Sequence, residues 1–205
     1  GPSRLVVSGA GGCSLREVVE HAHCALSAGA DAVLMPAPHF FKYSAADLAE
    51  YFEQAAAQIT APVILYNLAA FAAPIPCDIT LRLTASVPNI VGIKDSSGSL
   101  ETLEALRARP LPTEVRFVGH DGVLSPALER GLANGAISGI AGVLPELTVA
   151  LWESWKAGDR ERFDSLSRSQ RELLASVEAW PVPWALKLIA EFRGFGAAQF
   201  SLPLS

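Results

Sequence analysis

One lysine lies where the sequence otherwise predicts a buried strand. The stretch "NIVGIKDSSGS" is apolar and rich in β-branched residues up to Ile93, and Lys94 follows directly. An unpaired ammonium group is costly to remove from water, so a lysine in this position calls for a function. Burial favours the uncharged form of a lysine, whose nitrogen can attack a carbonyl carbon. The stretch therefore indicates a nucleophilic amine.

A tyrosine ends the preceding apolar run, "PVILYN", in the same way. Because alternate side chains of a strand share a face, Lys94, Gly92 and Ile90 are expected on one face, and Tyr66 and Ile64 on the corresponding face of the neighbouring strand. Tyr66 and Lys94 should then meet at adjacent strand ends. A phenol beside an amine can relay protons while an imine forms.

Simpler interpretations of both residues remain open at this point. A lysine at a strand end can pair with an adjacent carboxylate, here Asp95, or extend to solvent. A tyrosine in an apolar run is commonly a core residue. The two residues at matched strand ends favour the chemical interpretation over either residue alone.

Six short apolar runs rich in β-branched residues recur along the chain, with helical patterns between them. Runs that are apolar throughout are typical of parallel strands covered on both faces. The full glycine fingerprint of a dinucleotide-binding sheet is absent from "SGAGGCS". Polar residues at the ends of the runs favour a barrel, in which chemistry occurs at the carboxyl ends of the strands. The predicted strands lie within residues 4–9, 31–37, 62–67, 89–95, 114–120 and 135–142.

The sequence predicts a partial (β/α) barrel over residues 1–157 and a C-terminal helical extension over 158–205. A barrel of this type closes with eight strands, so six strands leave two unpaired edges. We therefore expect a gap between the first and sixth strands. We also expect either that the chain is part of a longer one or that another chain covers these edges.

Composition narrows the function classes. The chain has 205 residues, is 50% hydrophobic and carries a net charge of −5, which argues against nucleic acid or an anionic membrane surface as a partner. No apolar run is long enough to span a bilayer, and the N-terminus lacks a signal-peptide pattern. Three cysteines without C-x-x-C spacing argue against a disulfide framework or a zinc site. They are expected to be buried thiols in the cytoplasm, and no metal site is predicted.

Five segments in order resemble the dihydrodipicolinate synthase and N-acetylneuraminate lyase family of class I, Schiff-base aldolases. The resemblance implies an α/β fold of the (β/α)₈ TIM-barrel type with C-terminal helices, of which this chain carries six βα units and lacks the first two. It implies a homo-oligomer, usually a tetramer, that acts on pyruvate or a related 2-oxo acid without a cofactor. The matching segments are "GADAVLMPAPHFFK", "VILYN", "NIVGIKDSSG", "RFVGHDGVLSPALERGLANGAISGIAGVLPEL" and "PVPWALKLIAEFRG".

The resemblance also implies roles for individual residues. Lys94 would form the imine and Tyr66 would relay protons. The backbone carbonyl of Ile137 would lie beside the lysine. Gly119 and Asp121 would line the part of the pocket that selects the second substrate, although Asp121 is also a candidate N-cap of the following helix.

Departures from the family pattern narrow the expected substrate. Phe71 stands in the candidate substrate site where the dihydrodipicolinate synthases carry an arginine for a carboxylate, and an apolar ring cannot bind that dianionic ligand. Phe40 stands where the family often places a tyrosine contributed across a subunit interface. These differences favour an aldolase or dehydratase of the sugar-acid type and argue against dihydrodipicolinate synthesis.

Two other functions remain open. The chain could be a non-catalytic or truncated family member that binds a 2-oxo acid or a partner subunit, because the carboxylate-binding loop of the missing units is absent. It could instead be a barrel enzyme for a phosphate ligand, held by backbone N–H groups of "SGIAG", residues 138–142.

Overall fold

The computed structural model describes residues 4–109, 111, 114–181 and 183–200. The chain packs as two compact units. The first contains Gly1–Gly119 and Leu132–Ala136, and the second contains His120–Gly131 and Ile137–Ser205. These two units do not test the domain boundary expected at residue 157, which stays a prediction.

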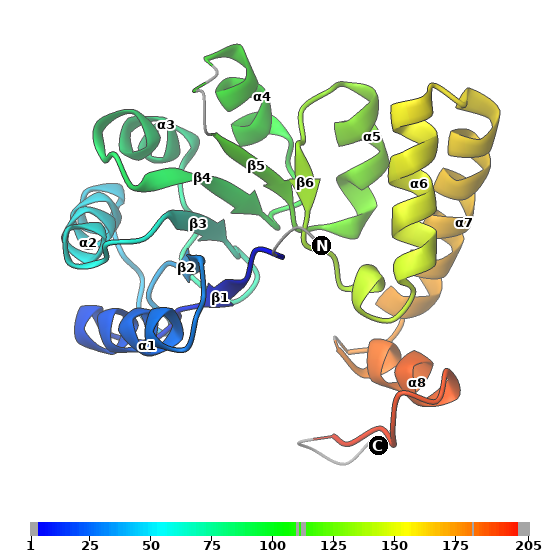
Figure 1. The fold of residues 1–205 in the computed structure, drawn as a ribbon, viewed down its shortest axis with the longest axis horizontal. Coiled ribbons are helices and arrows are strands. Elements are labelled where there is room, and N and C mark those ends of the chain that lie inside the picture. The colour runs from blue at the N-terminus through cyan, green and yellow to red at the C-terminus, as the bar shows by residue number, and fades with distance from the viewer. Residues whose placement is uncertain (1–3, 110, 112–113, 182, 201–205) are drawn as a thin grey trace. The chain divides into compact units, whose positions relative to one another are not determined.

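The first unit is a curled parallel sheet with helices on its outer side (Figure 1). Its six strands are arranged in sequence order, as predicted. The strands are β1 (Val7–Gly9), β2 (Ala32–Pro36), β3 (Val63–Asn67), β4 (Ile90–Asp95), β5 (Val115–Val118) and β6 (Gly135–Ala136). The helices are α1 (Leu15–Ser27), α2 (Ala45–Gln58), α3 (Cys77–Ser86) and α4 (Glu101–Ala108). Together they form an α/β half-barrel, and the count of six complete βα units stays a prediction.

The first two helices begin at capping boxes. The Ser14 side chain accepts a hydrogen bond from the Glu17 backbone N–H, and the Glu17 carboxylate accepts one from the Ser14 backbone N–H. Ser44 and Asp47 form the same reciprocal pair at the start of α2. Each box satisfies N–H groups that have no partner inside the helix, so it fixes where the helix leaves the preceding loop.

The pairing of β3 with β4 contains a one-residue irregularity. Val63 is paired with Ile90, but the next residue of β3, Ile64, is paired with Gly92. Val91 is therefore an extra residue in β4, which makes a β-bulge. Gly92 has a φ of +144°, a backbone conformation that side-chain-bearing residues rarely adopt.

The bulge decides which side chains share a face. After it, Tyr66 is paired with Lys94, so the two side chains leave the sheet on the same face, as predicted. The expectation that Ile90 shares this face is wrong, because Ile90 lies opposite Val63, before the bulge. If the same residues paired regularly from Val63 and Ile90 onward, Lys94 would lie opposite Asn67 and point to the other face.

The sheet is open at both edges. Within the described ranges, β1 pairs with β2 alone and β6 pairs with β5 alone, which leaves the predicted gap between the first and sixth strands. Apolar side chains just before β1 are exposed, with Leu5 at 81% and Val6 at 52%. An open edge of this kind offers unpaired backbone groups to another strand.

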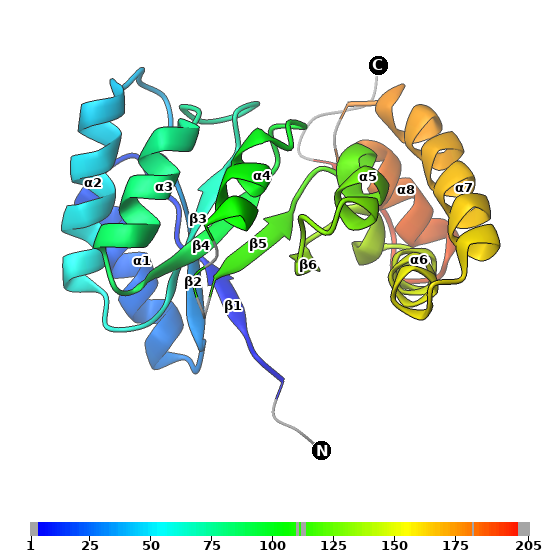
Figure 2. The same ribbon diagram turned by 90° about the horizontal axis from the view of Figure 1, so that it is seen from above.

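The second unit is helical, with α6 and α7 packed side by side (Figures 1 and 2). Gly158, with a φ of +71°, ends α6, and Asp159 then caps α7 by accepting a hydrogen bond from the backbone N–H of Arg162. The helices are α5 (Leu124–Glu129), α6 (Pro145–Ala157), α7 (Arg160–Glu178) and α8 (Trp184–Phe192), with 3-10 turns η1 (Asp121–Val123) and η2 (Ile140–Gly142).

The expectation of three buried cysteines is wrong. Cys13 and Cys24 are exposed, and Cys77 is half-buried. Cys13 precedes α1, and Cys24 lies on α1, whose buried residues are Val18, Val19 and Ala22. In the described part of the chain, no helix is long and apolar enough to cross a membrane, and no group of three or more His, Cys, Asp or Glu residues could hold a metal ion.

Replacing Gly92 with alanine should strongly destabilise the first unit. The new Cβ would overlap the backbone carbonyl oxygen of Val115 in β5, and the residue would keep an unfavourable positive φ. We expect a loss of more than about 2 kcal/mol in the free energy of unfolding, measured by urea denaturation. Gly29→Ala is the control, because Gly29 also has a positive φ but its Cβ would meet nothing within 4 Å. Its cost should be only about 1 kcal/mol, and equal costs would contradict the packing argument.

The three thiols should differ in reactivity. Burial raises the pKa of the Cys77 thiol, so Cys77 holds less of the reactive thiolate near pH 7. Iodoacetamide should therefore label the exposed Cys13 and Cys24 before Cys77, and raising the pH should accelerate the Cys77 reaction. Peptide mass spectrometry over a time course measures the order. Labelling of Cys77 first in the native protein would contradict the burial seen here.

Candidate active site

Lys94 and Tyr66 lie together at the carboxyl ends of β4 and β3. The Lys94 side chain is buried, with 7% of its surface exposed, and its Nζ lies 3.9 Å from the centre of the Tyr66 ring. Contact with the face of an aromatic ring partly compensates a buried ammonium group. The simpler interpretation of an ion pair between Lys94 and Asp95 is not supported, because successive residues of β4 point to opposite faces of the sheet. One Asp95 carboxylate oxygen, Oδ1, accepts hydrogen bonds from other partners.

Those partners form a polar network next to the lysine. Asn67 Nδ2 donates to Asp95 Oδ1 at 3.2 Å, and the Ser97 backbone N–H donates to the same oxygen at 2.8 Å. The Asn67 side-chain oxygen in turn accepts the backbone N–H of Ile75 at 3.1 Å. This network is not among the features predicted from the sequence. The sequence does contain a signal for it, because Asn67 and Asp95 each follow directly after one of the two proposed catalytic residues.

Gly119, at the end of β5, makes room for the lysine. A Cβ at this position would overlap Ser96 Oγ and lie 2.7 Å from Lys94 Cε. Its backbone N–H donates to the Asp95 carbonyl at 2.7 Å, which fixes the chain at this point. Gly119 therefore adjoins Lys94 within the first unit, and its part in selecting a second substrate stays a prediction.

Phe71 lies in an exposed loop after β3. Its side chain is 66% exposed and lines a cavity of about 480 Å³ between the loops that follow β2 and β3. Phe40 is 88% exposed and has a φ of +82°, which is rare for a bulky residue. Phe40, Phe41 and Tyr43 line the same cavity, so these loops present aromatic side chains to the surface.

Asp121 and Ile137 belong to the second unit, and their roles toward substrate stay predictions. The expectation that Asp121 caps a helix is wrong. His120 is the N-cap of η1 and accepts the Gly122 backbone N–H at 3.1 Å. The Asp121 carboxylate instead accepts hydrogen bonds from Ser138 Oγ and from the backbone N–H of Ile140. Ile137 is half-buried and directly precedes Ser138.

The backbone of "SGIAG" offers little to a phosphate. The N–H of Ile140 donates to Asp121, that of Ala141 donates to Ser138 Oγ at 2.9 Å, and that of Gly142 donates to the Gly139 carbonyl at 3.2 Å. Because these donors already have acceptors inside the second unit, the geometry does not favour the phosphate-enzyme alternative.

Comparisons with known proteins identify the family of this chain. The family model "Dihydrodipicolinate synthetase family" matches residues 4–205. The chain is 33% identical over 201 residues to "Uncharacterized DapA-like lyase OE_1665R" of Halobacterium salinarum, covering 97% of this chain and 65% of the relative. It is 33% identical over 204 residues to "Probable 2-dehydro-3-deoxy-D-pentonate aldolase YjhH" of Escherichia coli, covering 97% of this chain and 67% of that protein.

Solved structures agree with the fold. The dihydrodipicolinate synthase of Acinetobacter baumannii, solved in complex with pyruvate, superimposes with a TM-score of 0.89 at 27% sequence identity. The match covers 100% of this chain and 70% of that one. The chain thus spans about 65% of the length of the first curated relatives that it matches. On the family match and on these relatives, the chain belongs to the dihydrodipicolinate synthetase family of lyases.

Proposed function

We propose that this protein is a Schiff-base-forming lyase that acts on pyruvate or a related 2-oxo acid. The observation that carries the proposal is the buried Lys94, with its Nζ 3.9 Å from the centre of the Tyr66 ring. Lys94 is the nucleophile and Tyr66 relays protons. The pyruvate complex of the Acinetobacter baumannii structure supports the substrate class.

The reaction follows from these two side chains. The Lys94 nitrogen attacks the ketone carbon of the 2-oxo acid, and the ketone oxygen leaves as water after Tyr66 supplies a proton, which gives an imine. The protonated imine then accepts the electron pair of the bond between carbons 3 and 4 of the substrate as that bond breaks. Tyr66, which has given up its proton in the first step, takes up the proton of the hydroxyl group on carbon 4. An aldehyde leaves, the resulting enamine takes up a proton, and water releases pyruvate. A dehydratase would use the same imine to expel a hydroxyl group.

We assign the substrate to the sugar-acid type. Phe71 supports this choice, because its exposed apolar ring stands where an arginine would hold the carboxylate of the dihydrodipicolinate pathway substrate. The similarity to the pentonate aldolase of Escherichia coli gives independent support. We therefore propose an aldolase or dehydratase of 2-oxo sugar acids and not a dihydrodipicolinate synthase.

We further propose a homo-oligomer that works in the cytoplasm. The exposed aromatic side chains of Phe40, Phe41 and Phe71 support an interface on the loops after β2 and β3. Gly119, which adjoins Lys94, is proposed to line the substrate-binding site.

Trapping with borohydride tests the proposed imine. Incubation with pyruvate and sodium borohydride should leave a reduced pyruvyl adduct on Lys94, located by peptide mass spectrometry. Lys94→Ala should abolish the adduct. Tyr66→Phe should slow trapping by about 10²-fold or more, the usual size of a proton-transfer contribution. A panel of 2-oxo sugar acids in the same assay would rank substrates.

The controls separate chemistry from folding. Lys156→Ala removes an exposed lysine that pairs with Glu153, and it should leave trapping unchanged. Gly119→Ala keeps both reactive groups but displaces the Lys94 side chain, so trapping should fall while Lys94 remains present. A folded wild-type chain without an adduct on Lys94 would overturn the proposal. It would favour the alternative of a non-catalytic family member that binds a 2-oxo acid or a partner subunit.

A further inference from the structure

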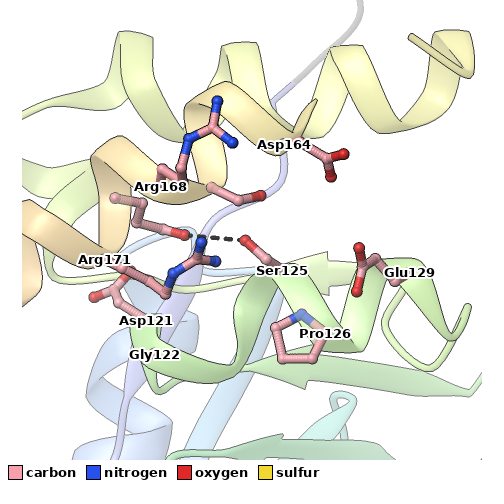
Figure 3. Close-up of a pocket in the computed structure, with 10 residues that line it drawn as sticks. Asp121, Gly122, Ser125, Pro126, Glu129, Asp164, Arg168 and Arg171 are labelled. Carbon is pink, nitrogen blue, oxygen red and sulfur yellow. Dashed lines mark hydrogen bonds between the residues drawn. The ribbon is translucent and has the colours of Figure 1, made fainter. Parts of the chain in front are cut away.

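The second unit contains a cavity of about 420 Å³ between η1–α5 and α7 (Figure 3). Four of its lining residues, at positions 164, 167, 168 and 171, follow one another at helical spacing and so lie on one face of α7. The opposite wall comes from η1 and α5. The lining residues are Asp121, Gly122, Ser125, Pro126, Glu129, Asp164, Ser167, Arg168, Gln170 and Arg171.

The acidic groups of this cavity already have partners. Arg160 holds both Glu129, at 2.7 Å, and Asp164, at 3.0 Å. The Asp121 carboxylate accepts hydrogen bonds from Ser138 and from the backbone N–H of Ile140. The carboxylates that line the cavity are therefore neutralised or hydrogen-bonded.

The basic groups do not have such partners. Among the residues that the structure describes, Arg168 and Arg171 make no hydrogen bond or ion pair. Both are exposed on α7. In Figure 3 their guanidinium groups lie apart from the carboxylates of Glu129 and Asp164. Two guanidinium groups are thus left without an acceptor beside the same cavity.

Two buried polar groups add to this excess of donors. Gln170 is 2% exposed and Ser167 is 4% exposed. Gln170 Nε2 and Ser167 Oγ have no hydrogen-bond partner within the described part of the chain. The Gln170 amide oxygen accepts a hydrogen bond from Ser125 Oγ at 3.5 Å, which directs the amide nitrogen elsewhere. A buried donor without an acceptor is costly, so a ligand that supplies acceptors would relieve a cost already present in the fold.

We propose that this cavity binds a small oxyanion, a carboxylate or a phosphate, between Arg168, Arg171 and the Gln170 amide. Guanidinium groups match the paired oxygens of such ligands, and charge-assisted hydrogen bonds are stronger than neutral ones. The cavity volume lies in the range of small-molecule sites. The net charge of the chain is −5, so the protein as a whole does not attract anions and binding must come from the local donors. Arg168, Arg171 and Gln170 differ from the residues to which the imine chemistry is assigned, Lys94 and Tyr66.

Titration calorimetry with inorganic phosphate and with succinate tests the site and separates the two ligand types. The wild-type chain should bind one of these probes. Arg168→Gln and Arg171→Gln should each weaken that binding by about tenfold or more, the size expected for a charge-assisted contact. Because both arginines are exposed, these variants should remain folded. In ¹⁵N-labelled protein, the Gln170 side-chain amide resonance should shift on binding.

Arg162→Gln is the matched control, because it removes the same charge from the same helix outside the cavity and should leave binding unchanged. Lys94→Ala should also keep the binding, which would distinguish this site from the proposed imine site. The proposal is overturned if the wild-type chain binds neither probe at about 10 mM. It is also overturned if Arg162→Gln or Lys94→Ala loses binding as much as the cavity variants do.

Discussion

A single extra residue in β4 sets the geometry on which the candidate site depends. In a regular pairing that starts from Val63 and Ile90, Lys94 would lie opposite Asn67 and point away from Tyr66. The bulge at Val91 moves the register by one residue and brings the amine and the phenol onto one face. Such a bulge needs a backbone conformation that glycine adopts readily, and Gly92 occupies the position. The proposed chemistry thus rests on the positive φ of one residue that takes no part in it.

The same register places different side chains on the two faces of these strands. Tyr66 and Lys94 leave the sheet on one face, while the next residues, Asn67 and Asp95, leave it on the other and hydrogen-bond to each other. Through Asn67, this pair also holds the backbone of Ile75 at the end of the loop after β3. A lysine with the proposed role must be held in place to react efficiently, and this buried hydrogen-bonded pair follows directly after the two residues of the candidate site.

The second unit shows how charge can be distributed unevenly within a small volume. Arg160 neutralises the carboxylates of Glu129 and Asp164, and the two arginines of the same helix that line the cavity have no acidic partner among the described residues. Buried donors of Ser167 and Gln170 lie on the adjoining turns of α7. In an acidic protein, such a local excess of donors is a specific feature of the site and not a consequence of overall composition.

The sequence by itself determined the order of the strands and helices, the parallel sheet and the position of Tyr66 and Lys94 at the ends of adjacent strands. These follow from apolar runs and strand-end residues, which are local patterns that survive in the fold. Only the tertiary structure decided the bulge, the exposure of Cys24 and the polar partners of Asp95. It also decided which arginines of α7 line the cavity of the second unit. These features depend on backbone conformation and on contacts between residues far apart in the chain, and neither leaves a periodic signal in the sequence.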